Sequence, residues 1–208
     1  MTSPLAIAAL GKCYGSRPIL TEIHLDIAPG EIVAVLGANG AGKSTLLGCV
    51  AGTVAADSGS VRIGGYDLTA DPLRARAALR YLPQEAEVLA GLTGRELLDL
   101  HAAIFRAALS PAALALADLG DALDHLATTY SVGMRRRLLL AALLAGEPAL
   151  WVLDEPFAGL DRPSRARLVD HLRAASKRGA GILLAGHDPE EPELALLGAR
   201  PFTLAARS

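Results

Sequence analysis

The chain has 208 residues, of which 51% are hydrophobic and only 4% aromatic, and its formal net charge is -2 at pH 7. This length suits one domain, or two small lobes that share a core. The balanced charge and the scarcity of aromatic side chains disfavour a broad basic surface for nucleic acid, so no nucleic-acid partner is expected.

Neither the cysteines nor the apolar runs indicate secretion or a membrane span. Cys13 and Cys49 have no CxxC spacing, so two buried thiols in a reducing compartment are expected. The apolar start of the chain has no cationic segment before it, so no signal peptide is expected. The longest apolar run, LLLAALLAG, is much shorter than the ~18 residues that a membrane helix needs. Any membrane role therefore requires a partner protein.

The first third of the chain is predicted to form β-strands. Apolar or alternating runs are separated there by segments rich in turn residues. A short hairpin is predicted to turn at Gly64 and Gly65. The predicted strands are LAIAAL, ILTEIHLDI, EIVAVLG and LRYLPQ, and the predicted hairpin is SVRIGGYDL.

The middle of the chain, residues 92–127, has a helical pattern and no strand pattern, which predicts a lobe beside the sheet. Thr93 and Glu96 have the spacing of a capping box. Ser110, with proline after it, is expected to cap a second helix. Gly120 is expected to stop that helix.

Helix and strand patterns alternate in the rest of the chain, which predicts a parallel sheet. The runs are LLLAALLAG (helix), ALWVLDE (strand), RPSRARLVDHLRAASKRG (helix), GILLAGH (strand) and PFTLAA (strand).

A glycine-rich segment after the strand IVAVL matches the phosphate-binding pattern G-x-x-x-x-G-K-[ST]. Its glycines allow the backbone to wrap around an anion, and the start of the following helix presents N–H groups to the same point. Lys43 is expected to contact the β- and γ-phosphates, and the Ser44 hydroxyl is expected to ligate Mg²⁺. A glycine-rich turn with an unrelated lysine is disfavoured by the strand before it and the helix after it. The predicted nucleotide-binding residues are Gly37, Ala38, Asn39, Gly40, Ala41, Gly42, Lys43, Ser44 and Thr45.

Two acidic residues follow the apolar strand in LWVLDEP. Asp154 ends the strand, where open parallel sheets bind ligands, and is expected to hold Mg²⁺ through water. Glu155 faces another direction and is expected to accept a proton from an attacking water. Taken alone, the pair could equally be a helix cap with a solvated neighbour.

Three single residues have positions that would complete such a site. Gln84 follows LRYLP at a strand end and could contact both metal and water. His187 follows GILLAG at another strand end, and Tyr14 lies on a glycine-rich turn where it could stack on a base. Each of these residue types, taken alone, is more often structural or surface-exposed.

The segment YSVGM, followed by three arginines, allows two interpretations. It could be a solvated surface turn. Ser131 and Gly133 at a helix start could instead form half of a phosphate site.

The order of these motifs resembles that of the nucleotide-binding subunits of ABC transporters. In that family the motifs run as Walker A, Q-loop, signature, Walker B, D-loop and H-loop. The corresponding segments here run as GANGAGKST, Gln84, YSVGM, LWVLDEP, AGLD and His187. The resemblance covers the chain from Leu5 to His187.

The resemblance implies an α/β fold: a P-loop NTPase core with a mostly parallel sheet, an N-terminal antiparallel β subdomain and an inserted helical lobe. It implies one ATPase domain over residues 1–208, with its core near 1–90 and 138–208 and its lobe near 91–137. ATP and Mg²⁺ would be its ligands, with Tyr14 stacked on adenine. The residues that would act on the subunit's own ATP are Lys43, Ser44, Gln84, Asp154, Glu155 and His187.

The resemblance also implies partners. Two such subunits, identical or paralogous, would form a head-to-tail dimer with ATP at the interface. Ser131 and Gly133 would contact the ATP held by the partner subunit, and Asp161 would lie at the interface. The dimer would drive a separate membrane permease, which would hold it at the cytoplasmic face of the cell membrane.

The signature departs from the commonest form, LSGGQ, at Tyr130, Val132 and Met134. A YS-x-GM form followed by arginine, together with TGRE in the lobe, resembles ATPases of drug, antibiotic and polysaccharide exporters, which we favour. The short chain also resembles the haem-exporter ATPases of cytochrome c maturation. A soluble ABC-type switch protein and a small P-loop kinase are weaker alternatives, because no second domain, coiled coil or acceptor site is evident.

Overall fold

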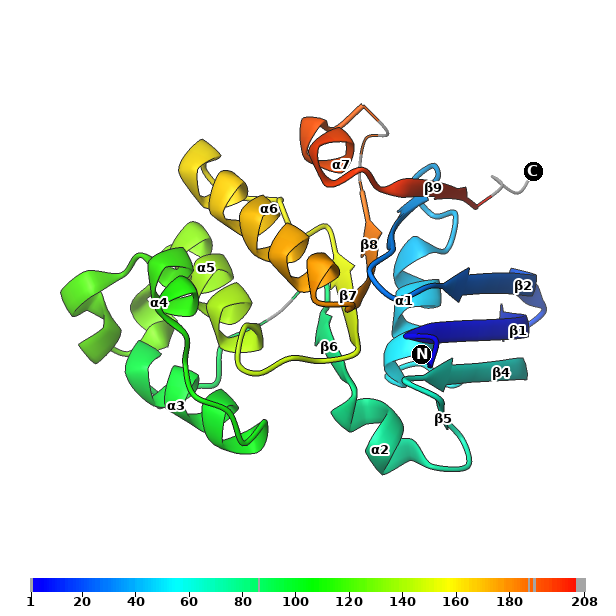
Figure 1. Ribbon diagram of the computed structural model, residues 1–208, viewed down its shortest axis with the longest axis horizontal. Coiled ribbons are helices and arrows are strands. Elements are labelled where there is room, and N and C mark those ends of the chain that lie inside the picture. The colour runs from blue at the N-terminus through cyan, green and yellow to red at the C-terminus, as the bar shows by residue number, and fades with distance from the viewer. Residues whose placement is uncertain (1, 86, 187, 189, 205–208) are drawn as a thin grey trace. The chain divides into compact units, whose positions relative to one another are not determined.

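The structure is a computed structural model that describes residues 2–85, 87–186, 188 and 190–204 (Figure 1). The chain divides into two compact units. The described parts of residues 1–84, 148–156 and 172–208 form the first unit. Residues 85 and 87–147, with residues 157–171, form the second.

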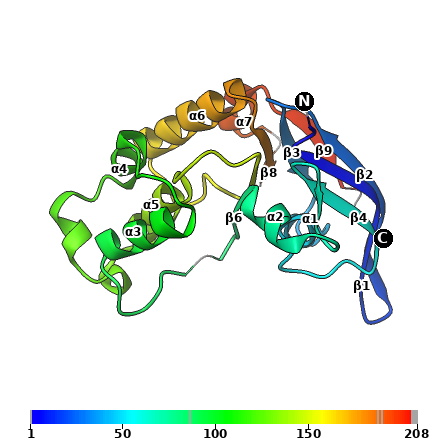
Figure 2. The ribbon, with the colours of Figure 1, turned by 60° about the horizontal axis from the view of Figure 1, so that its bottom comes forward.

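An antiparallel sheet of four strands, in the order β2-β1-β4-β5, lies in the first unit. β1, β2 and β4 run side by side in both views (Figures 1 and 2). Gly64 and Gly65 both have positive φ between β4 and β5, as a tight hairpin turn requires, so the predicted hairpin is confirmed. The strands are β1 (Leu5–Tyr14), β2 (Arg17–Ile27), β4 (Ser58–Ile63) and β5 (Tyr66–Asp67).

A parallel sheet of five strands, in the order β6-β7-β8-β3-β9, forms the rest of the first unit's β structure. All five residues of β7 and of β8 are buried, which explains their uninterrupted apolar sequences. Parallel pairing brings the carboxyl ends of these strands to one edge of the sheet. The strands are β3 (Ile32–Leu36), β6 (Leu79–Leu82), β7 (Leu150–Asp154), β8 (Gly181–Ala185) and β9 (Arg200–Thr203).

The helix α1 (Lys43–Ala51) packs against β7 and β8 and also contacts β2, so it joins the two sheets. Leu46 and Leu47 of this helix are fully buried in the core that it shares with both sheets. Apolar burial of this kind contributes about 25 cal/mol per Å² and is the main stabilising contribution in such a core. Two shorter helices, α2 (Pro72–Ala77) and α7 (Pro192–Leu197), complete the described helices that lie wholly in this unit, and α6 (Arg162–Lys177) contributes to both units.

The second unit is helical. It contains α3 (Gly94–Ile104), α4 (Pro111–Ala117) and α5 (Val132–Leu143), with 3-10 turns at Gly120–Asp124 and Ala127–Thr129 between α4 and α5. The predicted capping box begins α3: Glu96 N–H donates to Thr93 Oγ1 at 3.2 Å, and Thr93 N–H donates to the Glu96 carboxylate at 2.8 Å. The predicted fold class, with its parallel sheet, antiparallel subdomain and helical lobe, is therefore confirmed.

Two local predictions were wrong. The helix α4 ends at Ala117, and Asp118 takes the left-handed conformation after it, so Gly120 starts the next turn instead of stopping the helix. Cys13 is exposed, because it lies near the exposed end of β1, whereas Cys49 is buried as expected. In the part of the chain that the structure describes, no helix has the length and apolarity needed to cross a membrane.

Candidate functional site

The glycine-rich loop after β3 leads directly into α1. Gly42 precedes the helix with φ 100°, a left-handed conformation that glycine adopts at little cost. A Cβ there would lie 2.8 Å from Cγ2 of Ile19, so packing against β2 also requires glycine. The first N–H groups of a helix have no acceptor within it, so those of α1 are available to an anion.

Lys43 lies inside the loop, with only 8% of its surface exposed. Its Nζ donates to the carbonyl oxygens of Gly37 at 2.7 Å and Ala38 at 3.3 Å. These bonds hold the charged end within the loop that would surround a phosphate. The ammonium group is therefore positioned by this chain's own backbone.

A pocket of about 330 Å³ lies at the carboxyl edge of the parallel sheet. It joins the loop after β3 to the ends of β6 and β7, although these segments are far apart in the sequence. Its lining is strongly polar and contains a cation, an acid, two amides and a hydroxyl. The lining residues are Asn39, Gly40, Lys43, Ser44, Gln84 and Glu155. The structure thus brings together four of the residues predicted to act on ATP and Mg²⁺.

Asp154 is the last residue of β7, and 2% of its surface is exposed. Burial raises the pKa of Tyr81 on the neighbouring strand β6, and the negative charge of Asp154 raises that pKa further. Asp154 is thus a buried acidic group at the end of β7, directly before Glu155.

Glu155 leaves the strand in an unusual conformation. Its φ is 47°, in the left-handed region, and its N–H donates to the carbonyl of Ala185 on β8 at 3.1 Å. Outside glycine this conformation costs about 1–2 kcal/mol. It turns the chain so that the Glu155 side chain lines the pocket. The position of Glu155 was predicted, but this conformation was not, since nothing in the residue type indicates it.

The oxygen donors fit magnesium. Ser44 supplies a hydroxyl and Gln84 an amide oxygen in one pocket, and Asp154 supplies a carboxylate at the adjoining strand end. Mg²⁺ prefers oxygen ligands and usually takes only one or two from the protein in nucleotide sites. Within the described residues there is no cluster of three His, Cys, Asp or Glu that would indicate a transition-metal site.

Several of the residues predicted to act on the subunit's own ATP do not line this pocket, and one lies outside the described residues. Those not in the lining are Tyr14, Gly37, Ala38, Ala41, Gly42, Thr45 and Asp154. Tyr14 ends β1 at the β1–β2 hairpin, 54% exposed, with Nζ of Lys12 5.5 Å from its ring centroid. Its ring is thus accessible for stacking. Thr45 follows Ser44 in α1 and is not among the lining residues. His187 falls outside the described residues.

Ser131 caps α5 in the second unit, accepting a hydrogen bond from Met134 N–H at 3.3 Å. Val132 beside it is 70% exposed. A Cβ on Gly133 would meet the carbonyl oxygen of Gly159 at 3.4 Å, an ordinary contact. The fold of this chain therefore does not require glycine at position 133, which is half-buried.

Three arginines follow the signature, and two of them donate to backbone carbonyl groups of the second unit. Arg135 Nη1 donates to the carbonyl of Tyr130 at 2.8 Å. Arg137 Nε donates to the carbonyl of Ala117 at 3.0 Å, at the negative end of α4. Arg136 is buried. Arg135 and Arg137 are half-buried, so the three side chains do not form a fully solvated face.

Residues 20–158 match the family model described as ABC transporter. The chain belongs to the ABC transporter family. It is an ATP-binding subunit of that family and an ABC ATPase. The order of its motifs, its fold and the strongly polar pocket at the sheet edge agree with this assignment.

Relatives and solved structures extend the comparison. A probable ABC transporter ATP-binding protein of Azorhizobium caulinodans is 36% identical, over 90% of this chain and 69% of its own length. The daunorubicin/doxorubicin resistance ATP-binding protein DrrA of Streptomyces peucetius is 36% identical, over 88% of this chain and 57% of its own length. The Nod factor export ATP-binding protein I of Rhizobium meliloti is 34% identical, over 92% of this chain and 59% of its own length.

Two solved structures superpose closely on this ABC ATPase. An ATP-binding subunit of an ABC transporter has a TM-score of 0.81 at 31% identity, covering 88% of this chain and 79% of its own. An ATP-binding cassette in a dimeric, post-hydrolysis state with ADP and phosphate has a TM-score of 0.81 at 22% identity, covering 96% and 94%. The second likeness shows the fold alone.

Proposed function

We propose that this ABC ATPase is the ATP-hydrolysing subunit of an exporter and drives a separate membrane permease. The observation that carries the proposal is the pocket in which Lys43, Ser44, Gln84 and Glu155 converge. The relatives named for drug resistance and for Nod factor export favour the exporter branch over the haem-exporter and soluble alternatives. The whole of residues 1–208 would act as a single ATPase domain.

Each polar residue of the pocket would have a distinct role toward ATP. The loop from Gly37 to Thr45 would surround the phosphates with backbone N–H groups, and Lys43 would neutralise charge on the β- and γ-phosphates. Glu155 would accept the proton of the attacking water. Gln84 and His187 would orient that water and the γ-phosphate, and Tyr14 would stack on adenine.

Three oxygen donors would hold a magnesium ion with the nucleotide: the Ser44 hydroxyl, the Gln84 amide and, through water, the Asp154 carboxylate. The ion supplies charge neutralisation between the β- and γ-phosphates. Lys43 lines the same pocket, so the lysine and the ion would both supply positive charge to the phosphates.

A second subunit would complete the site. Ser131, which is exposed, and Gly133, which is half-buried, lie at the start of α5, and they would contact the γ-phosphate of ATP held by the partner. A head-to-tail dimer with a second copy or a paralogue follows, and a solved neighbour of the same fold is dimeric. Bound to its permease, the dimer would lie at the cytoplasmic face of the membrane.

ATP turnover by the purified protein tests this function. Glu155→Gln should retain ATP binding and lose turnover by at least about 100-fold, because the general base is gone. Glu22→Gln is a matched control, since Glu22 is an exposed glutamate that also has a left-handed backbone, with φ 51°. Unchanged turnover in Glu155→Gln would remove Glu155 from the mechanism. Phosphate release without an added acceptor separates an ATPase from a kinase, and co-purification of a polytopic membrane protein supports the permease.

A further inference from the structure

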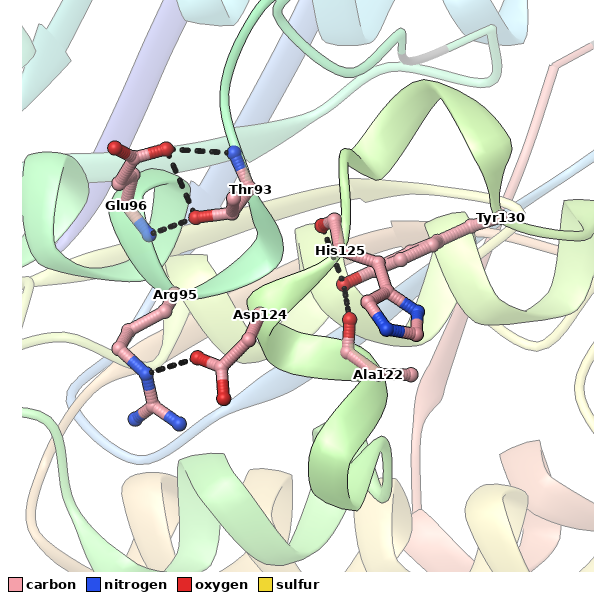
Figure 3. Close-up of polar contacts among 7 residues, drawn as sticks. All are labelled: Thr93, Arg95, Glu96, Ala122, Asp124, His125 and Tyr130. Atoms are coloured by element: carbon pink, nitrogen blue, oxygen red, sulfur yellow. Dashed lines mark hydrogen bonds and ion pairs between the residues drawn. The ribbon is translucent and has the colours of Figure 1, made fainter.

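Tyr130 directly precedes the signature serine and is buried, with 4% of its surface exposed. Its side chain points back into the helical unit, toward the 3-10 turns between α4 and α5 (Figure 3). The hydroxyl makes a short hydrogen bond to the carbonyl of Ala122 and lies 3.3 Å from the carbonyl of His125. The phenol therefore contacts two carbonyl groups at the end of the 3-10 turn Gly120–Asp124, in the segment that leads up to Ser131.

Gly94, the first residue of α3, packs directly on this phenol. A Cβ on Gly94 would collide with the Tyr130 hydroxyl and would approach Cζ of the ring at 3.2 Å. Gly94 N–H also donates to the carbonyl of His125 at 3.2 Å, so the same carbonyl contacts both residues. The absence of a side chain at position 94 and the hydroxyl at position 130 are therefore complementary.

Two further links join the first turn of α3 to the segment before the signature. Arg95 Nε lies 2.7 Å from the carboxylate of Asp124 (Figure 3). Thr93 and Leu126 form an isolated antiparallel bridge. The ion pair is exposed on both sides and contributes little. The buried phenol is the stronger link, since its partners would lose their hydrogen bonds in a site that water cannot easily enter.

We infer that Tyr130 is a positioning residue: its hydroxyl fixes where Ser131 and α5 begin and ties that point to the first turn of α3. The inference rests on the proposed role of Ser131 in the partner's ATP site. Ser131 is bonded directly to Tyr130 and caps α5, so a shift of the turn at Ala122–His125 moves the serine hydroxyl with it. A displacement of about 1 Å can lower a rate by as much as 100-fold.

Mixed dimers test the inference. Two differently tagged copies are co-expressed and purified through both tags, and one copy carries Glu155→Gln, so that only the other copy's Walker site hydrolyses ATP. In a head-to-tail dimer, the signature of the Glu155→Gln copy completes that competent site. Tyr130→Phe is then placed either on the Glu155→Gln copy or on the competent copy. It keeps the buried ring and removes only the hydroxyl.

The expected loss of kcat is about tenfold when Tyr130→Phe is on the Glu155→Gln copy, and less than about twofold when it is on the competent copy. The KM for ATP should change by less than about twofold in both arrangements, because the Walker residues are intact. Equal losses in the two arrangements would indicate a general folding defect and would overturn the inference. Wild-type turnover in both arrangements would also overturn it.

Ser131→Ala in the same two arrangements separates this inference from the proposed function. If Ser131→Ala shows no dependence on arrangement, the shared ATP site itself is wrong, and the inference falls with it. Ser131→Ala could lower turnover only when it is on the Glu155→Gln copy, while Tyr130→Phe has no effect on either copy. That result would support the shared site and contradict the positioning role of Tyr130 alone.

A double-mutant cycle in the ordinary dimer supplies a second test. Gly94→Ala should lower turnover strongly beside Tyr130, because the new Cβ displaces the hydroxyl. When Tyr130→Phe is also present, Gly94→Ala should cause a several-fold smaller loss of turnover, since the ring can move by a few tenths of an ångström. Purely additive effects would show that the two positions do not act through this contact.

Discussion

Asp154 and Glu155 are neighbours in the chain but leave β7 in different conformations: Asp154 continues the strand, and Glu155 turns into the left-handed region with φ 47°. The direction of the Glu155 side chain is therefore set by this turn and not by the alternation of side chains along the strand. Asp154 stays buried at the strand end, and Glu155 lines the pocket with Lys43. The proposed metal-holding and proton-accepting roles thus fall on two carboxylates in different surroundings.

The positive φ of Glu155 predicts that its glycine variant is more stable than its alanine variant, the reverse of the usual order. Glu155→Gly should be more stable than Glu155→Ala by about 1 kcal/mol, because only glycine adopts a positive φ without cost. Urea unfolding of both variants measures the difference. Both should hydrolyse ATP far more slowly than the unmodified chain, so that any gain in stability accompanies a loss of function.

Two other positions serve as controls for the comparison of glycine and alanine variants. Glu22, with φ 51°, should show the same order of stability for its glycine and alanine variants. Arg173, an exposed residue in the interior of α6, should show the opposite order, with alanine more stable than glycine by about 1 kcal/mol. Alanine proving as stable as glycine at position 155 would contradict strain at Glu155.

Ser131 is expected to contribute both to stability and to turnover, and Ser110 separates the two. Each serine caps a helix of the second unit: Ser131 Oγ accepts from Met134 N–H, and Ser110 Oγ accepts from Ala113 N–H at 3.1 Å. Replacing either with alanine should lower the free energy of unfolding by about 1 kcal/mol. Only Ser131→Ala should also lower ATP turnover, since only that hydroxyl would contact phosphate.

An aspartate at position 131 provides the converse experiment. Ser131→Asp keeps a capping oxygen, so the unfolding free energy should stay close to that of the unmodified chain. Its negative charge would face the γ-phosphate of the partner's ATP, so turnover should fall further than in Ser131→Ala. A Ser131→Asp protein with normal turnover would rule out phosphate contact at this position.

Local sequence signals predicted much of this molecule. The capping box at Thr93 depends on residues within one helical turn, and the polar edge of the sheet follows from apolar strands that alternate with helices. The convergence of Lys43, Gln84 and Glu155 could therefore be anticipated from motif order and parallel topology. Each of these signals is either local or repeated along the chain.

Features that depend on distant contacts were not predicted. The contact between Gly94 and Tyr130 forms only once the second unit has folded, and neither residue type indicates the other. The end of α4 at Asp118 was missed because aspartate adopts the left-handed conformation less often than glycine. The exposure of Cys13 follows from strand ends and register, which composition does not reveal.

A substitution at Gly133 tests whether this glycine is required by the fold or by a ligand. Because a Cβ there meets only ordinary contacts, Gly133→Ala should leave the unfolding free energy unchanged or raise it by up to about 1 kcal/mol, as expected for alanine in a helix. ATP turnover should nonetheless fall, because the methyl group would occupy space next to the partner's γ-phosphate. Unimpaired turnover in this variant would place the phosphate elsewhere.

Gly48 serves as the steric control for that experiment. It also lies in a helix, α1, but a Cβ there would come within 2.8 Å of Cγ2 of Val54. Gly48→Ala should therefore destabilise the chain by about 1–3 kcal/mol through overpacking. The two glycine variants should thus change stability in opposite or clearly different ways under the same urea titration.

The two cysteines predict a pH-dependent difference in stability and reactivity. Burial raises the pKa of the Cys49 thiol from its ordinary value of 9.0 to about 11. The unfolded chain therefore loses this proton at lower pH than the folded chain, so the stability due to Cys49 is fully present below pH 9 and is lost as the pH rises toward 11. In that window the unfolding free energy should fall more steeply than in Cys49→Ala, by up to about 1.4 kcal/mol per pH unit.

Alkylation at pH 8 examines the same thiol directly. Exposed Cys13 should react quickly with iodoacetamide, whereas buried Cys49 should react only when α1 opens. ATP with Mg²⁺ should slow the Cys49 reaction further, because α1 begins in the phosphate loop and ligand binding stabilises the folded state. Mass spectrometry of the same sample reads the alkylation at each cysteine. A Cys49 reaction rate that ATP with Mg²⁺ leaves unchanged would contradict a nucleotide site at the start of α1.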